Sequence, residues 1–425
     1  MHHFLHRSHA ARIFHLLALI SAVFLLIVAV GCGGNSSNSS STSTTTPTPG
    51  SANTGGNSGS GSGGSSASLS APKFVYALNS VAIVPAGVQA FRIDPSTGVL
   101  TATTGATIAN TNSLTGLAAT PATNFVFVAD WIAKTITSFH ADASSGALTK
   151  LATTAVPALQ GTPELLVDQT GKFLFVSDSL ANHVFAFSIG SDGSLTSVAG
   201  SPFSAPIATG RLSTDAAGHF LFGTANNQIV GFTIAANGAL TPVPGTPLTV
   251  RAPFDNPDKG PVGIEAAIDP QARFLFVADS VNPVLHVYTI GASGALTEVS
   301  GSPFQIGAAS QLPVVDPTGR FLFLGSYALA QVAAFSINQS TGAITAAPGS
   351  PYDNGPFRNG GAPVLDAKVD PSGKFLLLAD SEETKITVFS IDQSTGALTN
   401  VPGSPFLTAD KPLGGGTPSA LAITH

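Results

Sequence analysis

Four charged residues of this chain, Glu164, Arg211, Glu265 and Asp366, occupy equivalent positions in separate segments of the sequence. Each lies four residues before an aspartate that ends a short segment, as in ELLVD at 164–168 and EAAID at 265–269. A guanidinium beside carboxylates can hold an anion or polarise a carbonyl, and a neighbouring carboxylate can activate water. This chemistry requires a fold that brings the separate segments together.

The elements around these residues form one long repeat that begins at Lys73. Each unit of about 50 residues contains an apolar run such as FLFVAD, a second apolar segment that ends in a turn, a third segment that opens with ALT or SLT, and a fourth before the next run. The apolar runs begin at Phe74, Phe125, Phe173, Phe220, Phe274, Phe321 and Phe375. Four short strands in each of seven units predict an all-β fold, a seven-bladed β-propeller with four antiparallel strands per blade.

The two ends of the repeat predict how the ring closes. The first unit lacks its innermost strand, and the last unit is followed by a single strand of that type, PSALAITH at 418–425. We therefore expect the C-terminal strand to complete the N-terminal blade, which removes open sheet edges. The innermost strands would then place one residue per blade in a ring around the central channel, namely Ala420, Gly116, Glu164, Arg211, Glu265, Leu312 and Asp366.

Two interpretations of this ring remain open. The charged members could form a polar binding site at the channel mouth, or a Glu–Arg–Glu plug that satisfies its own charges. Three long connections, at 247–263, 351–364 and 406–417, open on the same face and favour a binding face. The predicted ligand-binding residues are Glu164, Arg211, Glu265, Asp366, Asp258, Lys259, Asp353 and Arg358.

The cadence of FLFVAD, VFSIDQSTGALT and PGSPF resembles the seven-bladed propellers of the lactonase family, the 6-phosphogluconolactonase-like group, over residues 72–425. The resemblance implies hydrolysis of a sugar lactone, with Arg211 polarising the carbonyl and Glu164 or Glu265 activating water. The chain contains no Pro-Arg-His run, which enzymes of the family carry. The sequence therefore favours a binding module for a small polar ligand, a glycan or a protein partner, with a lactonase-type hydrolase as the alternative.

The N-terminal segment predicts export. Residues 1–31 contain Arg7 and Arg12 followed by the apolar run LLALISAVFLLIVAV and resemble a bacterial lipoprotein signal peptide that ends before Cys32. Lipidation of Cys32 would anchor the protein to the cell envelope, at the outer membrane or cell surface. An ordinary secretory leader is the alternative. Residues 32–71 carry no charge and read as a disordered Ser/Thr/Gly tether, so the folded domain would span 72–425.

Composition excludes several other functions. Charged residues make up 9% of the chain and the formal net charge is −6, which argues against a nucleic-acid partner. One cysteine cannot form a disulfide scaffold or a zinc–thiolate site. The histidines after the leader show no HxH or HxxxH spacing, and no glycine-rich phosphate loop precedes a helix. We therefore expect neither a metal ion nor a cofactor.

Overall fold

The computed structural model of the chain describes residues 73–79, 87–103, 108–109, 114–250, 264–280, 282–307, 312–326, 330–354, 364–380, 385–408 and 418–424. All of these residues belong to one compact unit, Leu69–His425. The predicted signal peptide, the tether and Cys32 lie outside the described residues. Among the residues described, no helix is long and apolar enough to cross a membrane.

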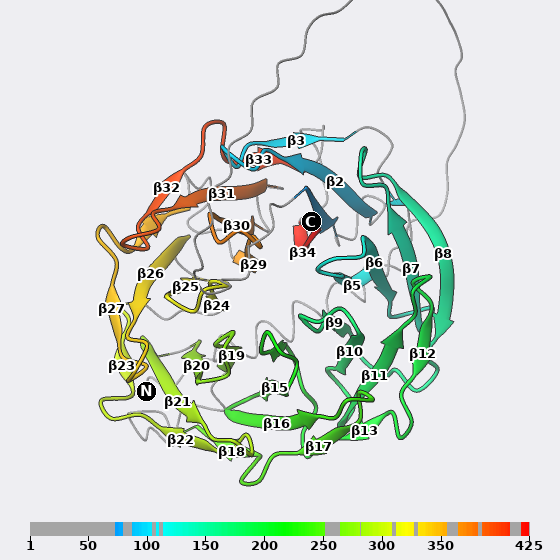
Figure 1. Cartoon of the computed structure of the whole chain (residues 1–425), viewed down its shortest axis with the longest axis horizontal. Coiled ribbons are helices and arrows are strands. Elements are labelled where there is room, and N and C mark those ends of the chain that lie inside the picture. The colour runs from blue at the N-terminus through cyan, green and yellow to red at the C-terminus, as the bar shows by residue number, and fades with distance from the viewer. Residues whose placement is uncertain are drawn as a thin grey trace, which may run out of the picture. The chain divides into compact units, whose positions relative to one another are not determined.

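Seven antiparallel sheets are arranged around a central axis, as predicted (Figure 1). The innermost strands of the seven blades are β34 (Pro418–Thr424), β5 (Leu114–Ala119), β9 (Pro163–Val167), β14 (Leu212–Thr214), β19 (Ile264–Ile268), β24 (Pro313–Val315) and β29 (Val364–Val369). The second strands are β1 (Phe74–Asn79), β6 (Phe125–Asp130), β10 (Phe173–Asp178), β15 (Phe220–Ala225), β20 (Phe274–Asp279), β25 (Phe321–Gly325) and β30 (Phe375–Asp380). The third strands are β2 (Gly87–Ile93), β7 (Thr135–Ala141), β11 (His183–Ile189), β16 (Gln228–Ile234), β21 (Val284–Ile290), β26 (Gln331–Ile337) and β31 (Lys385–Ile391).

The outer strand is continuous in one blade and divided in the other six. The continuous strand is β8 (Leu148–Ala155). The divided strands are β3 (Leu100–Ala102) with β4 (Ile108–Ala109), β12 (Leu195–Ser197) with β13 (Phe203–Ser204), β17 (Leu240–Pro242) with β18 (Leu248–Thr249), β22 (Leu296–Glu298) with β23 (Phe304–Gln305), β27 (Ile344–Ala346) with β28 (Tyr352–Asp353), and β32 (Leu398–Asn400) with β33 (Phe406–Leu407). In five of these blades a Gly-Ser-Pro or Gly-Thr-Pro sequence lies in the gap. In the third blade, Ser201 Oγ accepts a hydrogen bond at 3.0 Å from the amide of Ala186 on the third strand. This turn explains why the sequence repeats Ser-Pro at the position of the break.

The C-terminal strand closes the ring, as predicted from the incomplete first unit. Strand β34 pairs antiparallel with β1, in a register that places Thr424 opposite Phe74 and Ala420 opposite Leu78. The first blade therefore combines the beginning and the end of the propeller sequence. Strand β1 has a hydrogen-bonded neighbour on both sides, β2 and β34, so neither of its edges is open.

Phenylalanines pack between adjacent blades. The second strand of each blade begins with a Phe, and this side chain lies against a turn of the next blade. In one junction, Phe173 lies beneath Gly238, whose φ of +84° belongs to the left-handed region. A Cβ atom at Gly238 would lie 2.4 Å from Phe173 Cε1, so only glycine fits both the backbone conformation and the packing.

Because the strands alternate in direction, the innermost strands begin on the same side of the ring as the second strands end. We call this side the entry face. The innermost strands end on the opposite face, where aspartates such as Asp168 hold the turn. Asp168 Oδ1 accepts hydrogen bonds from the amides of Lys172 at 2.9 Å and Phe173 at 2.7 Å.

Candidate functional site

Strand register places the predicted ring residues at one level on the entry face. Glu164 pairs with Ser177, Glu265 pairs with Ala278, and Asp366 pairs with Ala379. In each case the partner residue directly precedes the aspartate that ends the second strand. The innermost strands surround the central axis (Figure 1), and equivalent pairing in separate blades gives these residues equivalent positions on them.

Arg211 crosses the centre of the ring and joins three blades. It precedes β14 in the fourth blade, yet its Nη1 donates to Asp366 Oδ1 of the seventh blade at 2.8 Å. Its Nη2 donates to the carbonyl oxygen of Leu365 at 3.1 Å. Its Nε lies 3.2 Å from Glu265 Oε2 in the fifth blade. The guanidinium is therefore fixed in position before any ligand binds.

Arg211 and Glu265 leave polar atoms without full partners. The Nε of Arg211 and the Oε2 of Glu265 are both buried, and neither has a hydrogen-bond partner although they form an ion pair. The two side chains are 20% and 27% exposed, so neither is sealed from solvent as a whole. Nη1 and Nη2 of a guanidinium each carry two hydrogens, and the contacts described account for one on each. The cluster can therefore donate further hydrogen bonds to a ligand.

Asp366 is the point at which the most contacts meet. Its Oδ2 accepts a hydrogen bond from the amide of Leu421 at 2.8 Å, and its Oδ1 accepts one from the amide of Ala367 at 2.9 Å. Lys368 Nζ lies 3.3 Å from the same Oδ1. Burial alone would raise the pKa of Asp366, but the charges of Lys368 and Arg211 and the hydrogen bonds from Arg211 and the Leu421 amide lower it below its ordinary value. Asp366 is therefore a fixed anion that anchors Arg211.

Glu265 has the opposite tendency. Burial raises the pKa of the Glu265 carboxyl above its ordinary value, and the charges of Glu164 and Asp366 raise it further, against the lowering effect of Arg211. Burial would lower the pKa of the Arg211 guanidinium, but Asp366, Glu265 and Glu164 together raise it. Arg211 stays charged, whereas Glu265 can exchange a proton closer to neutral pH than an ordinary glutamate.

The arrangement differs in one respect from the Glu164–Arg211–Glu265 order expected from the sequence. In the part of the chain that the structure describes, the ion pairs of Arg211 are with Glu265 and Asp366. Glu164 is exposed, and its charge acts on both Arg211 and Glu265. The guanidinium reaches past the adjacent blade because an arginine side chain is long enough to cross the narrow centre of the ring.

Lys368 was not recognised from the sequence, although a signal was present. It lies two residues after Asp366 on β29, and residues two apart share one face of a strand. The same alternation that places Asp366 at the axis therefore places Lys368 on the same face of β29, two residues further along the strand from the entry face.

The remaining predicted site residues do not join this cluster in the described structure. Asp353 lies on β28 at the outer part of its blade, where its Oδ1 accepts a hydrogen bond from Gln331 Nε2 at 3.1 Å. Asp258, Lys259 and Arg358 lie outside the described residues. Their assignment to a binding face stays a prediction.

The described residues contain no group of three or more His, Cys, Asp or Glu that could hold a metal ion. Aspartates that end the second strands instead accept hydrogen bonds from backbone amides, as expected for turn residues. Asp178 accepts from Gln160 at 2.6 Å, from Gly161 at 2.8 Å and from Leu180 at 3.0 Å.

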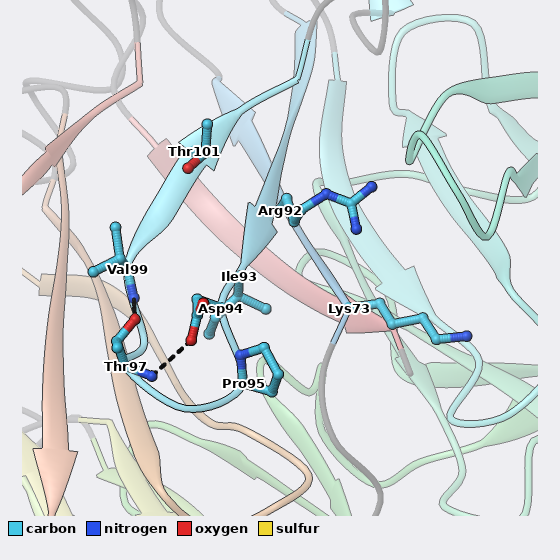
Figure 2. A pocket seen from close by; sticks show the side chains of 8 residues that line it. All are labelled: Lys73, Arg92, Ile93, Asp94, Pro95, Thr97, Val99 and Thr101. Carbon is cyan, nitrogen blue, oxygen red and sulfur yellow. Dashed lines mark hydrogen bonds between the residues drawn. The ribbon is translucent and has the colours of Figure 1, made fainter. Parts of the chain in front are cut away.

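A surface pocket of about 630 Å³ lies in the first blade, at its opposite face, around the turn from β2 to β3 (Figure 2). Its cations are Lys73 and Arg92, and Asp94 is engaged by the amide of Thr97 at 2.8 Å. Arg92 lies over the Phe74 ring at 4.9 Å and donates to a carbonyl of the next blade, that of Ser144. Arg92 thus links two blades, and we place the candidate site at the ring instead.

The comparisons with known proteins agree with the seven-bladed fold. The sequence matches the family described as "Lactonase, 7-bladed beta-propeller" over residues 63–356, which is more than half of the chain. The chain therefore belongs to the lactonase family of seven-bladed β-propellers. No curated protein matches the sequence.

Two solved structures illustrate the shared fold. A putative 6-phosphogluconolactonase from Bacteroides fragilis is 20% identical with a TM-score of 0.61, and the match covers 84% of this chain and 99% of that one. The periplasmic gluconolactonase of Pseudomonas aeruginosa is 17% identical with a TM-score of 0.61, and the match covers 83% of this chain and 99% of that one. At these identities the likeness shows the fold alone.

Proposed function

We propose that the protein hydrolyses a sugar lactone at the cluster of Arg211, Glu265 and Asp366. One observation carries the proposal: a carboxyl with a raised pKa lies 3.2 Å from a guanidinium that is already held in place. Membership of the lactonase family supports the same chemistry. Hydrolysis of a lactone needs a base for water and a donor for the carbonyl oxygen, and the cluster offers both.

The proposed reaction uses this chain's own residues. Arg211 donates a hydrogen bond to the lactone carbonyl oxygen, which becomes negatively charged when water attacks the carbonyl carbon. Ionised Glu265 takes a proton from that water as the new C–O bond forms. The ring C–O bond then breaks, and the proton passes to the departing alkoxide oxygen. The product is an open-chain hydroxy acid, which releases a proton to solvent at neutral pH.

Two carboxylates remain for supporting roles. Asp366 holds Arg211 through a 2.8 Å hydrogen bond and is a positioning residue. Glu164 is exposed beside the cluster, where its oxygens can accept hydrogen bonds from substrate hydroxyls. The structure favours Glu265 over Glu164 as the base, because Glu265 is adjacent to the guanidinium and has the raised pKa.

The test is acid release in a pH-stat with the full chain and a panel of sugar lactones, corrected for spontaneous hydrolysis. We expect Glu265→Gln to lose at least a hundredfold in kcat while the protein keeps its β-type circular dichroism. Glu164→Gln should raise KM more than it lowers kcat. Hydrolysis that is no faster than the spontaneous rate for every lactone would refute the proposal.

A binding module for a small polar ligand, a glycan or a protein partner is the second candidate. It is favoured by Arg211, which Asp366 and the Leu365 carbonyl hold in place and which keeps hydrogens on Nη1 and Nη2 for a ligand. The same lactones, offered in isothermal titration calorimetry, separate the two functions. Saturable binding without turnover would favour the module.

We also propose that the protein is exported and lipid-anchored to the cell envelope through Cys32. This proposal rests on the apolar run that precedes the cysteine and on the uncharged stretch that follows it. The tether of residues 32–71 would hold the propeller away from the membrane. Incorporation of radiolabelled palmitate into the full chain, and its loss in Cys32→Ser, would test the anchor.

A further inference from the structure

The charges that face the central axis do not add up to a cationic site. On the described innermost strands and the residues that lead into them, three carboxylates, Glu164, Glu265 and Asp366, accompany two cations, Arg211 and Lys368. The sum is −1 when Glu265 is ionised and zero when it is protonated. In neither protonation state of Glu265 is the axis positive.

Both cations are already paired. Arg211 is engaged by Asp366 and Glu265, at 2.8 Å and 3.2 Å. Lys368 lies 3.3 Å from Asp366, and its side chain is 41% exposed. Recognition of a phosphate group relies on free guanidinium or ammonium groups or on a helix N-terminus. The described strands offer no such helix, and the charge of each of their two cations is already offset by a neighbouring carboxylate.

The long connections add no net charge of their own to the sequence around the ring. Segment 247–263 contains two acidic and two basic residues, segment 351–364 contains one of each, and segment 406–417 contains one of each. Each connection therefore has a formal charge of zero as a whole. The negative balance proposed for the site rests on the described ring residues.

We propose that this site selects uncharged sugar lactones and discriminates against phosphorylated ones. The inference rests on the proposed lactone hydrolysis and names its substrate class. A phosphate monoester carries a charge of about −1.5 to −2 at neutral pH. It would meet exposed Glu164, and both cations of the described innermost strands are already paired with carboxylates. The hydroxyl groups of an uncharged sugar both donate and accept hydrogen bonds, so they suit a site rich in carboxylate oxygens.

The first experiment compares glucono-1,5-lactone with its 6-phosphate as substrates of the full chain. We expect kcat/KM to be at least about tenfold higher for the uncharged lactone, which corresponds to about 1.4 kcal/mol. The difference should shrink when salt is added at constant pH, because salt screens the exposed Glu164 charge. A higher kcat/KM for the phosphorylated lactone would overturn the proposal.

A pair of variants separates the local effect from the overall charge. Glu164→Gln removes one negative charge at the axis and should improve the phosphorylated substrate relative to the uncharged one by about three- to tenfold. Asp392→Asn removes one negative charge on the opposite face and should leave the ratio unchanged. The fold accepts this control, because Asn338 occupies the same turn in the preceding blade, before the same Gln-Ser-Thr-Gly sequence. Equal shifts in the two variants would contradict the proposal.

A binding measurement keeps the inference testable if no lactone is hydrolysed. Glucitol and glucitol 6-phosphate, titrated calorimetrically, probe the same charge difference without a reaction. Tighter binding of glucitol would uphold the selectivity while the hydrolase proposal fails. Tighter binding of the phosphate, or no binding of either probe, would refute the selectivity itself.

Discussion

Replacement of Arg211 by glutamine separates catalysis at the ring from simple closure of the ring. The variant removes a charge that two carboxylates share and leaves Asp366, which is 4% exposed, with Lys368 and backbone amides as its remaining partners. Breaking a buried ion pair costs about 3 kcal/mol when one partner is removed. At about 2.1 cal/mol/K of unfolding entropy per residue, that loss lowers Tm by about 4 °C in a domain of roughly 350 residues.

The expected effect on turnover is much larger than the effect on stability. Loss of one donor to a developing oxyanion typically lowers kcat by about 10²–10³. Arg211→Gln should therefore remain folded at 25 °C and lose nearly all lactone hydrolysis in the pH-stat. Arg211→Lys should recover part of the stability but little of the turnover, since an ammonium cannot reproduce the three directions in which the guanidinium reaches.

Arg273→Gln is the matched control. Arg273 donates to buried Asp269 through Nε and Nη2, both at 2.8 Å, on the opposite face of the ring. The control should lose a similar amount of stability and keep its turnover. Wild-type kcat in folded Arg211→Gln would refute the catalytic role. An equal fall of kcat in the two variants would show that activity follows stability alone.

Three further predictions concern packing, pH and location. Gly238→Ala should melt below Gly245→Ala, because both glycines have a φ near +84° but only the Cβ at Gly238 would collide with Phe173, an overlap worth about 1–3 kcal/mol; equal melting temperatures would contradict this packing. The raised pKa of Glu265 predicts that kcat/KM rises with pH through a midpoint above the ordinary glutamate value of about 4.3, and a midpoint at or below that value in pH-rate profiles would exclude it as the base. Cys32→Ser should move the protein from the membrane fraction to the soluble fraction on immunoblots, and retention in the membrane would argue against a lipid anchor.

The blade architecture could be predicted from the sequence because each blade uses the same contacts. The phenylalanine that begins a second strand and the glycine in the next blade's turn meet at every junction, so the repeat in the sequence is also a repeat of packing. The incomplete first unit and the extra last strand predicted the closure that β34 and β1 form. The common position of the charged ring residues along the central axis could also be predicted, because each lies four residues before the aspartate that follows its innermost strand.

The partners within the ring could not be predicted in the same way. Blade order places Glu164 and Glu265 on either side of Arg211, but the position along the chain does not say how far a side chain reaches. The guanidinium extends to Asp366, three blades further on. The pairing depends on the width of the centre and on the backbone carbonyl of Leu365, neither of which leaves a pattern in the sequence.

Asp366 connects the closure of the ring to its chemistry. Its Oδ2 accepts the amide of Leu421 on the C-terminal strand, while its Oδ1 holds Arg211 and Lys368. The strand that completes the first blade therefore also fixes the anion that orients the guanidinium. A loosened C-terminal strand would free Asp366, and with it Arg211, even though neither residue lies on that strand. In this propeller the position of the site thus depends on the junction of the first and last strands, β1 and β34, so closure of the ring and the geometry of Arg211 belong to one structural unit.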